Sequence, residues 1–71
     1  PQQREELRRW QRKALRAVKD GRPAGVTFIT DAVAEDTQAV IRERLSIAAT
    51  EEEVKAAFEP PFRSVESLPY P

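Results

Sequence analysis

The side chains that could do chemistry in this chain are carboxylates, guanidinium groups and ammonium groups, because the sequence contains no histidine and no cysteine. The chain therefore lacks the residues of the usual nucleophile–base pairs and the commonest metal ligand. Consecutive glutamates at residues 51–53 splay around a helix instead of converging on one point. Asp31, Glu35 and Asp36 lack the spacing and the turn glycine of a calcium loop. The sequence predicts a protein that is not an enzyme, with no catalytic residues, no cofactor and no metal site.

The clearest chemical signal is a concentration of positive charge near the N-terminus. Residues 1–22 carry eight basic and three acidic side chains, a net charge of +5, whereas residues 23–71 carry four basic and nine acidic ones, a net charge of −5. The formal net charge of zero hides this division. The candidate interaction face consists of Arg8, Arg9, Arg12, Lys13, Arg16 and Lys19.

Four interpretations of this basic face stay open. Rows of arginine and lysine neutralise nucleic-acid phosphates, and a basic amphipathic helix can dock on an acidic protein or lie on an anionic membrane. The face can also be solvated and complement acidic helices of the same domain, which the overall neutrality favours. An alanine-rich stripe and the lack of a long apolar run disfavour a membrane. Trp10 falls in the apolar stripe, so we expect core packing rather than base stacking.

The N-terminal segment has the pattern of an amphipathic helix over residues 3–20. Its apolar side chains recur at intervals of three and four residues, which places them on one face of a helix. Gly21 suits a left-handed C-terminal cap, and Pro23 prevents continuation. The stripe consists of Leu7, Trp10, Ala14, Ala17 and Val18.

Two further helices are expected, over residues 33–48 and 51–59. Asp31 is a candidate N-cap for the first of them. Thr50 and Glu53 have the spacing of a capping box for the second. Arg44 interrupts the apolar face of residues 33–48, so we expect it to extend past the core edge or to pair with an acid. Residues 25–30 favour an extended connector with Phe28 inserted into the core.

The predicted fold is all-α: a compact three-helix domain at residues 1–59, with one short extended connector and a disordered proline-rich tail at residues 60–71. Phe62 and Tyr70 lie in this tail, which is either passive or a short docking motif. The side chains expected to carry the fold are Leu7, Trp10, Phe28, Ile41, Leu45 and Phe58. Further core candidates are Leu15, Val18, Val26, Ile29, Val33, Val40, Ile47 and Val54.

The order of these features resembles a small C-terminal helical region of tailed-bacteriophage head proteins, portal proteins first and head-morphogenesis proteins second. The resemblance covers residues 4–58 and excludes the tail. It rests on a leucine–basic–basic–tryptophan helix, a basic-glycine turn, an extended phenylalanine and a threonine–acid–acid–valine helix. In this chain those motifs comprise Leu7, Trp10, Ala14, Leu15, Gly21, Phe28, Ile41, Leu45, Thr50 to Val54, and Phe58.

The resemblance implies a structural and interaction module involved in capsid assembly and DNA packaging. Its implied partners are domains of the parent chain or other copies of itself, and DNA through the first helix, with no membrane. The implied location is the cytoplasm during assembly and then the virion; apart from the resemblance, we expect an intracellular location. The alternative, from the residues alone, is a small independent nucleic-acid-binding module that uses the basic face. The absence of methionine predicts that the chain is part of a longer protein.

Overall fold

A computed structural model describes residues 2–25 and 27–62 of the chain. It contains three helices, α1 (Gln2–Lys19), α2 (Glu35–Ser46) and α3 (Glu51–Ala57), and no strand within these described ranges. The all-α, three-helix prediction is therefore confirmed. The expected helices at 3–20, 33–48 and 51–59 all agree with the observed bounds to within two residues at each end, and α2 is the one that is shorter at both ends.

α1 ends in the turn that the sequence predicted. Gly21 has a φ of 76°, a left-handed conformation that glycine adopts without strain. The amide of Gly21 donates to the carbonyl of Val18, and the amide of Arg22 donates to the carbonyl of Ala17. This pair of bonds is a Schellman motif, which satisfies the last carbonyls of the helix. The chain reverses direction at this turn.

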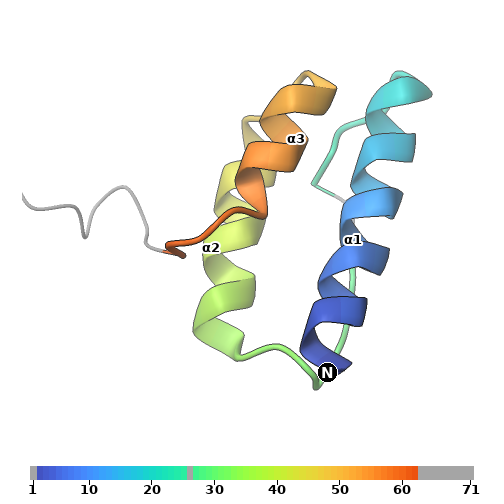
Figure 1. Cartoon of the computed structure of the whole chain (residues 1–71). Coiled ribbons are helices and arrows are strands. Elements are labelled where there is room, and N and C mark those ends of the chain that lie inside the picture. Colours follow the sequence, from blue (N-terminus) through green and yellow to red (C-terminus); the bar gives the residue numbers. More distant parts are fainter. Residues whose placement is uncertain (1, 26, 63–71) are drawn as a thin grey trace, which may run out of the picture.

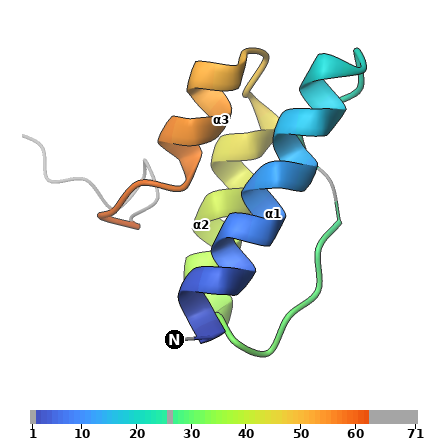
Figure 2. The same cartoon turned by 45° about the vertical axis from the view of Figure 1, so that its right-hand side comes forward.

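The segment after the turn runs back along α1 to the start of α2 (Figures 1 and 2). Phe28 is 7% exposed, so the expectation that it fills the core is confirmed. Ile29 was expected in the core, but it is 85% exposed. Successive side chains of an extended chain point in opposite directions, so burial of Phe28 turns Ile29 outward. Val26, another core candidate, lies outside the described residues.

The start of α2 differs from the prediction. Its N-cap is Ala34, with no side-chain cap hydrogen bond, so the assignment of Asp31 as N-cap is wrong. The residues before α2 are held in place instead by Gln38, which is 4% exposed. Its Nε2 donates to the carbonyls of Thr30 at 2.9 Å and Val33 at 2.7 Å. A buried amide that satisfies two loop carbonyls fixes the approach of the connector to α2.

The capping box at the start of α3 is confirmed. The Thr50 hydroxyl accepts from the Glu53 amide at 3.1 Å, and Oε1 of Glu53 accepts from the Thr50 amide at 3.0 Å. Oε1 also accepts from the Ala49 amide at 2.9 Å. The hydrogen bonds from the Ala49 amide and the Thr50 hydroxyl lower the pKa of Glu53, with a smaller contribution from the Thr50 amide. The backbone amides of Ala49, Thr50 and Glu53, which have no partner within the helix, thus each find a side-chain acceptor.

We expect Glu53→Ala to lower the thermal midpoint at neutral pH. A carboxyl with a lowered folded-state pKa stabilises the fold fully above its ordinary value of 4.5, and this stabilisation is lost as the pH falls through the folded pKa. The deficit of the variant should therefore shrink in acid. Circular dichroism melts at neutral and acidic pH measure it, with Glu52→Ala as the matched control. An equal deficit at both pH values would contradict this role of the carboxylate.

α3 is the element that joins the domain, because it contacts both α1 and α2. α1 and α2 run in the same direction and α3 runs opposite to them (Figure 1). Trp10 of α1 is fully buried between two aromatic rings. The Phe28 ring stacks on it at 5.6 Å between centroids, and the Phe58 ring meets it edge-on at 5.4 Å. Connector and α3 therefore both pack on one tryptophan.

The six side chains expected to carry the fold all contribute to this core. Trp10, Phe28, Ile41 and Leu45 are buried, and Leu7 and Phe58 are half-buried against them. Of the other candidates, Val33 and Val54 are buried, Leu15 and Val18 pack at the edge, and Val40 is half-buried.

Ile47 is wrongly predicted as a core residue, since it is 78% exposed. It lies two residues beyond Leu45, about 200° around the helix axis from the buried side of α2. Ala24, which the sequence analysis left out, is 1% exposed and occupies part of the core.

Arg44 fastens the end of α3. Its guanidinium donates to the carbonyls of Ala57 at 3.4 Å, Glu59 at 3.0 Å and Pro61 at 2.6 Å. It also lies 5.7 Å from the centroid of the Phe62 ring, which packs against the core. The carbonyl of Pro61 and the ring of Phe62, which the sequence analysis assigned to the tail, thus contact α2 and the core. Tyr70 and the rest of the predicted tail lie outside the described residues.

Candidate functional site

The predicted basic face lies on the outer side of α1. Its members Arg8, Arg9, Arg12, Lys13, Arg16 and Lys19 are all exposed. Trp10, Ala14 and Ala17 on the opposite side of the same helix are buried. The apolar stripe thus fixes the orientation of the helix, and the cations point to solvent because they occupy the remaining arc.

The ion pairs in the described part of the chain are local. Nη1 of Arg9 lies 3.7 Å from Oε1 of Glu6 one turn earlier, and Nη2 of Arg22 lies 2.9 Å from Oδ2 of Asp20. Within the described residues, no ion pair joins α1 to α2 or α3. In the described part of the chain, the basic helix is therefore not neutralised through ion pairs with the acidic helices of its own domain.

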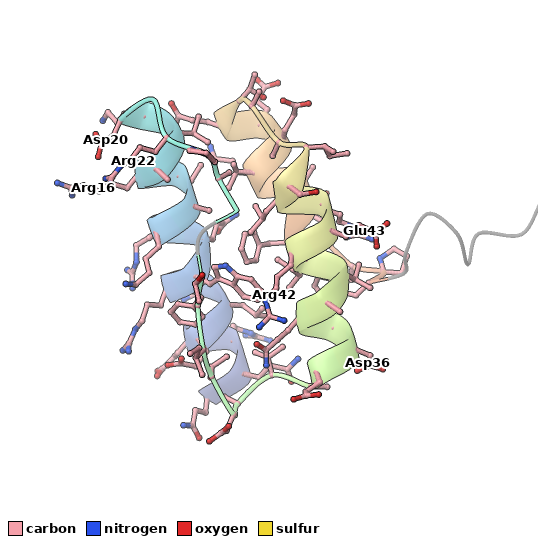
Figure 3. All side chains as sticks on the ribbon, turned by 180° about the vertical axis from the view of Figure 1, so that it is seen from behind. Arg16, Asp20, Arg22, Asp36, Arg42 and Glu43 are labelled. Atoms are coloured by element: carbon pink, nitrogen blue, oxygen red, sulfur yellow. The ribbon has the colours of Figure 1, made fainter. Side chains whose placement is uncertain are left out.

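Four of the predicted cations line a groove between α1 and the returning chain. Arg9, Arg12, Lys13 and Arg16 form one side, and Arg22 stands at the turn end. Figure 3 shows Arg16 and Arg22 on the same outer side of the molecule, with Asp20 beside Arg22. The groove has a volume of about 650 Å³. Its remaining lining consists of Ala17, Pro23, Gly25 and Thr27.

The local fold explains why Arg22 belongs to this groove although the sequence analysis did not include it. The left-handed Gly21 reverses the chain, and the residues that follow run back beside α1. Arg22 is thereby placed near the last turns of the helix, with its side chain 68% exposed. The sequence signal was the glycine turn itself, because a chain that reverses after a helix must bring its next residues alongside that helix.

The other two predicted cations lie outside the groove. Arg8 lines a separate hollow between α1 and α3, together with Arg4, Lys55 and the half-buried Leu7 and Phe58. Lys19 lies near Glu51 at the opposite end of α1. The single face expected from the sequence is therefore divided, and its densest part is the groove.

The groove offers charge and hydrogen-bond donors but no aromatic surface. Trp10, weighed as a base-stacking residue, is fully buried, and Phe28 is buried beside it. Neither side chain lines the groove. Four of the five cations are arginines, whose planar guanidinium groups can donate two parallel hydrogen bonds to one anionic group. The chemistry of the site is thus the binding of anions by several arginines at once.

The opposite side of the domain is acidic. Residues 31–62 contain eight carboxylates and three cations, and all eight carboxylates are exposed. Asp36 and Glu43 project from α2 on the side away from the groove (Figure 3). The groove side of α1 and the outer side of α2 therefore carry opposite charge, whereas Glu51 and Glu59 border hollows beside α1. The exposed acids are Asp31, Glu35, Asp36, Glu43, Glu51, Glu52, Glu53 and Glu59.

Among the described residues, no group of three or more acidic, histidine or cysteine side chains could hold a metal ion. This includes Asp31, Glu35 and Asp36, which the sequence analysis weighed as cation ligands. None of the described helices is both long and apolar enough to cross a bilayer. No family model, curated protein or solved structure matches the chain. The resemblance to phage head proteins thus stands on the sequence motifs alone.

Proposed function

We propose that this chain is a non-enzymatic interaction module that binds an anionic partner through the basic face of α1. The observation that carries the proposal is that cations of α1 are exposed and lack ion-pair partners within the described part of the domain. Arg12, Lys13 and Arg16 are exposed, and none of them has an ion-pair partner within the described ranges. A row of like charges repels itself, so a bound polyanion would stabilise this arrangement.

The non-enzymatic part of the proposal rests on composition. The full sequence contains no histidine and no cysteine, the residues that most often serve as general base or nucleophile. The described carboxylates are spread over all three helices and their connections, and all of them except the half-buried Glu6 are exposed. Such a surface supports recognition by charge rather than proton transfer in an enclosed site.

We further propose that the setting is the head of a tailed bacteriophage, as part of a portal protein or, second, a head-morphogenesis protein. The motif order at residues 4–58 supports this proposal. In that setting the basic groove would meet DNA during packaging, or acidic surfaces of neighbouring copies or parent-chain domains during assembly. The opposite charges on the two sides of the domain are compatible with contacts between copies. The chain would act first in the cytoplasm and then in the virion.

A column experiment tests the binding function. We expect the chain to be retained on resins that carry heparin or poly-L-glutamate and to elute as salt is raised, because the contact is electrostatic. Arg12→Glu combined with Arg16→Glu should move elution to markedly lower salt. Arg4→Glu combined with Lys55→Glu changes the net charge equally at two exposed cations outside the groove and is the control for charge alone. A parent chain that flows through both resins would contradict the proposed function.

A further inference from the structure

The basic groove has features that distinguish between classes of anionic partner. Protein interfaces are built around buried apolar and aromatic side chains. The large apolar side chains that are strongly exposed in the described part of the chain are Ile29 and Ile47, and neither lines the groove. Its apolar lining is limited to Ala17, Pro23 and Gly25. The groove therefore lacks the anchors of a protein-binding site.

The composition of the groove suits phosphate groups. Arginine binds phosphate oxygens through paired, charge-assisted hydrogen bonds, which lysine cannot do. Arg9 and Arg16 are seven residues apart, a rise of about 10 Å along α1. Phosphates follow one another every 3.4 Å or so along the axis of each duplex strand, so this length spans about three of them. Arg22 extends the cationic surface beyond the helix.

The lack of an aromatic ring in the lining of the groove favours a duplex over a single strand. Proteins that bind single strands stack bases on aromatic side chains. Trp10 is fully buried, and Phe28 is 7% exposed. A site without stacking surfaces contacts the backbone only, and it therefore binds with little dependence on base sequence.

Overall neutrality does not prevent such binding. Asp36 and Glu43 of α2 project from the side away from the groove, one helix layer away, which is roughly 10 Å. Glu51 and Glu59 lie beside α1, but neither lines the groove. The Debye length at physiological salt is about 8 Å, so a backbone held in the groove is largely screened from those acids.

Asp20 competes with an anionic ligand for Arg22, one of the cations that line the groove. Its Oδ2 accepts from Nη2 of Arg22 at 2.9 Å, and its side chain is 46% exposed. The carboxylate both occupies a guanidinium donor and repels an approaching anion. Figure 3 shows Asp20 and Arg22 side by side, near Arg16.

We propose, building on the function proposed above, that this groove binds the phosphate backbone of duplex nucleic acid without sequence preference and that Asp20 weakens the binding by holding Arg22. The contacting cations are Arg9, Arg12, Lys13 and Arg16, with Arg22 joining when it leaves Asp20.

Fluorescence anisotropy with a labelled duplex of about 20 base pairs tests this. With four phosphate contacts, the logarithm of the association constant should fall with the logarithm of salt at a slope of about −4, which is roughly a 100-fold loss between 50 and 200 mM salt. Arg12→Glu with Arg16→Glu should lower affinity more than 10-fold and bring the slope to about −2. A second duplex of different base composition should bind equally well.

Asp20→Asn provides the sharper test, because it strengthens binding. We expect about a threefold gain in affinity and a slope steeper by about 1, as Arg22 becomes available. Asp36→Asn is the matched control, since it changes the net charge equally on the far side of α2. Circular dichroism should show parent-like helicity for all these variants, because each substituted side chain is exposed.

The outcomes separate the two proposals. Retention on heparin or poly-L-glutamate without duplex binding would overturn the phosphate assignment and leave the binding function intact. Absence of binding to all three probes would overturn both. The assignment of the binding surface to the groove would be overturned in two cases. One is duplex binding that Arg12→Glu with Arg16→Glu leaves unchanged, and the other is an equal gain from Asp20→Asn and Asp36→Asn. Duplex binding that the groove variants change as stated supports it.

Discussion

Trp10→Ala should leave this domain unfolded at room temperature. Trp10 is fully buried, and it packs against Phe28 from the connector and Phe58 from the end of α3. Replacing a buried tryptophan by alanine costs about 3–5 kcal/mol. A single small core rarely supplies more than about 3–5 kcal/mol of net stability. The expected loss is therefore as large as the whole free energy of unfolding.

Far-UV circular dichroism during a thermal melt measures this effect, and Trp10→Phe is the control. Phenylalanine keeps a ring between Phe28 and Phe58 and removes the buried indole Nε1–H, which has no hydrogen-bond partner. A buried unpaired donor costs about 1–3 kcal/mol, so its removal offsets part of the lost packing. Trp10→Phe should stay folded. A cooperative transition for Trp10→Ala near the parent midpoint would show that the core is centred elsewhere.

Arg44→Ala should lower the free energy of unfolding by about 2 kcal/mol, the second largest effect that we expect. The guanidinium of Arg44 donates to the carbonyl of Ala57, the last residue of α3, and to those of Glu59 and Pro61 beyond it. The last carbonyls of a helix have no partner within the helix. A cation at a helix C-terminus also interacts favourably with the helix dipole. Loss of this side chain should release residues 58–62 from α2.

Urea unfolding gives the stability change, and amide hydrogen exchange localises it. The amides of Phe58 and Glu59 donate within the last turn of α3 and should exchange faster in Arg44→Ala than in the parent. Arg44→Lys keeps the charge but not the planar fork, so we expect it to fall between the two. Unchanged exchange at residues 58 and 59 would mean that Arg44 does not fasten this end of the domain.

The sequence predicts the elements whose signals are local. The stripe of α1, the left-handed Gly21 and the capping box of Thr50 and Glu53 each depend on residues within one or two turns, and the structure confirms all three. Phe28 is also predicted correctly, because a lone aromatic residue in an extended connector needs a core to cover it. Local periodicity and capping therefore determine most of this fold.

Two features that the sequence analysis missed depend on hydrogen bonds that reach outside a single helix. The start of α2 is set by Gln38, whose amide reaches back to Thr30 and Val33, and no capping rule anticipates such a bond. Gln38 precedes Ile41 by three residues and Leu45 by seven, so the helical period placed it on the buried face. Arg44 was taken for an irregularity of the apolar face, because the carbonyls that it binds belong to the end of α3 and to the residues that follow it.

The sequence predicted only the α1 side of the candidate site, because the other side is brought in by the packing of the chain. The sequence places Arg9, Arg12, Lys13 and Arg16 on one arc of α1, which is a local property. The second wall of the groove comes from the chain that returns after Gly21 and brings Arg22 to the same anion-binding surface. The sequence also could not show whether acidic helices would neutralise α1, since that depends on how α2 and α3 pack.

An NMR titration with unlabelled duplex tests the central claim most directly. The claim is that the arginine-lined groove along α1 is the surface that meets a polyanion. Changes in amide chemical shift should concentrate at residues 9–25 and disappear at high salt. The amide chemical shifts of Asp36 and Glu43 on α2 should stay unchanged. Shifts centred on α2 or α3, or no shifts at low salt, would contradict the claim.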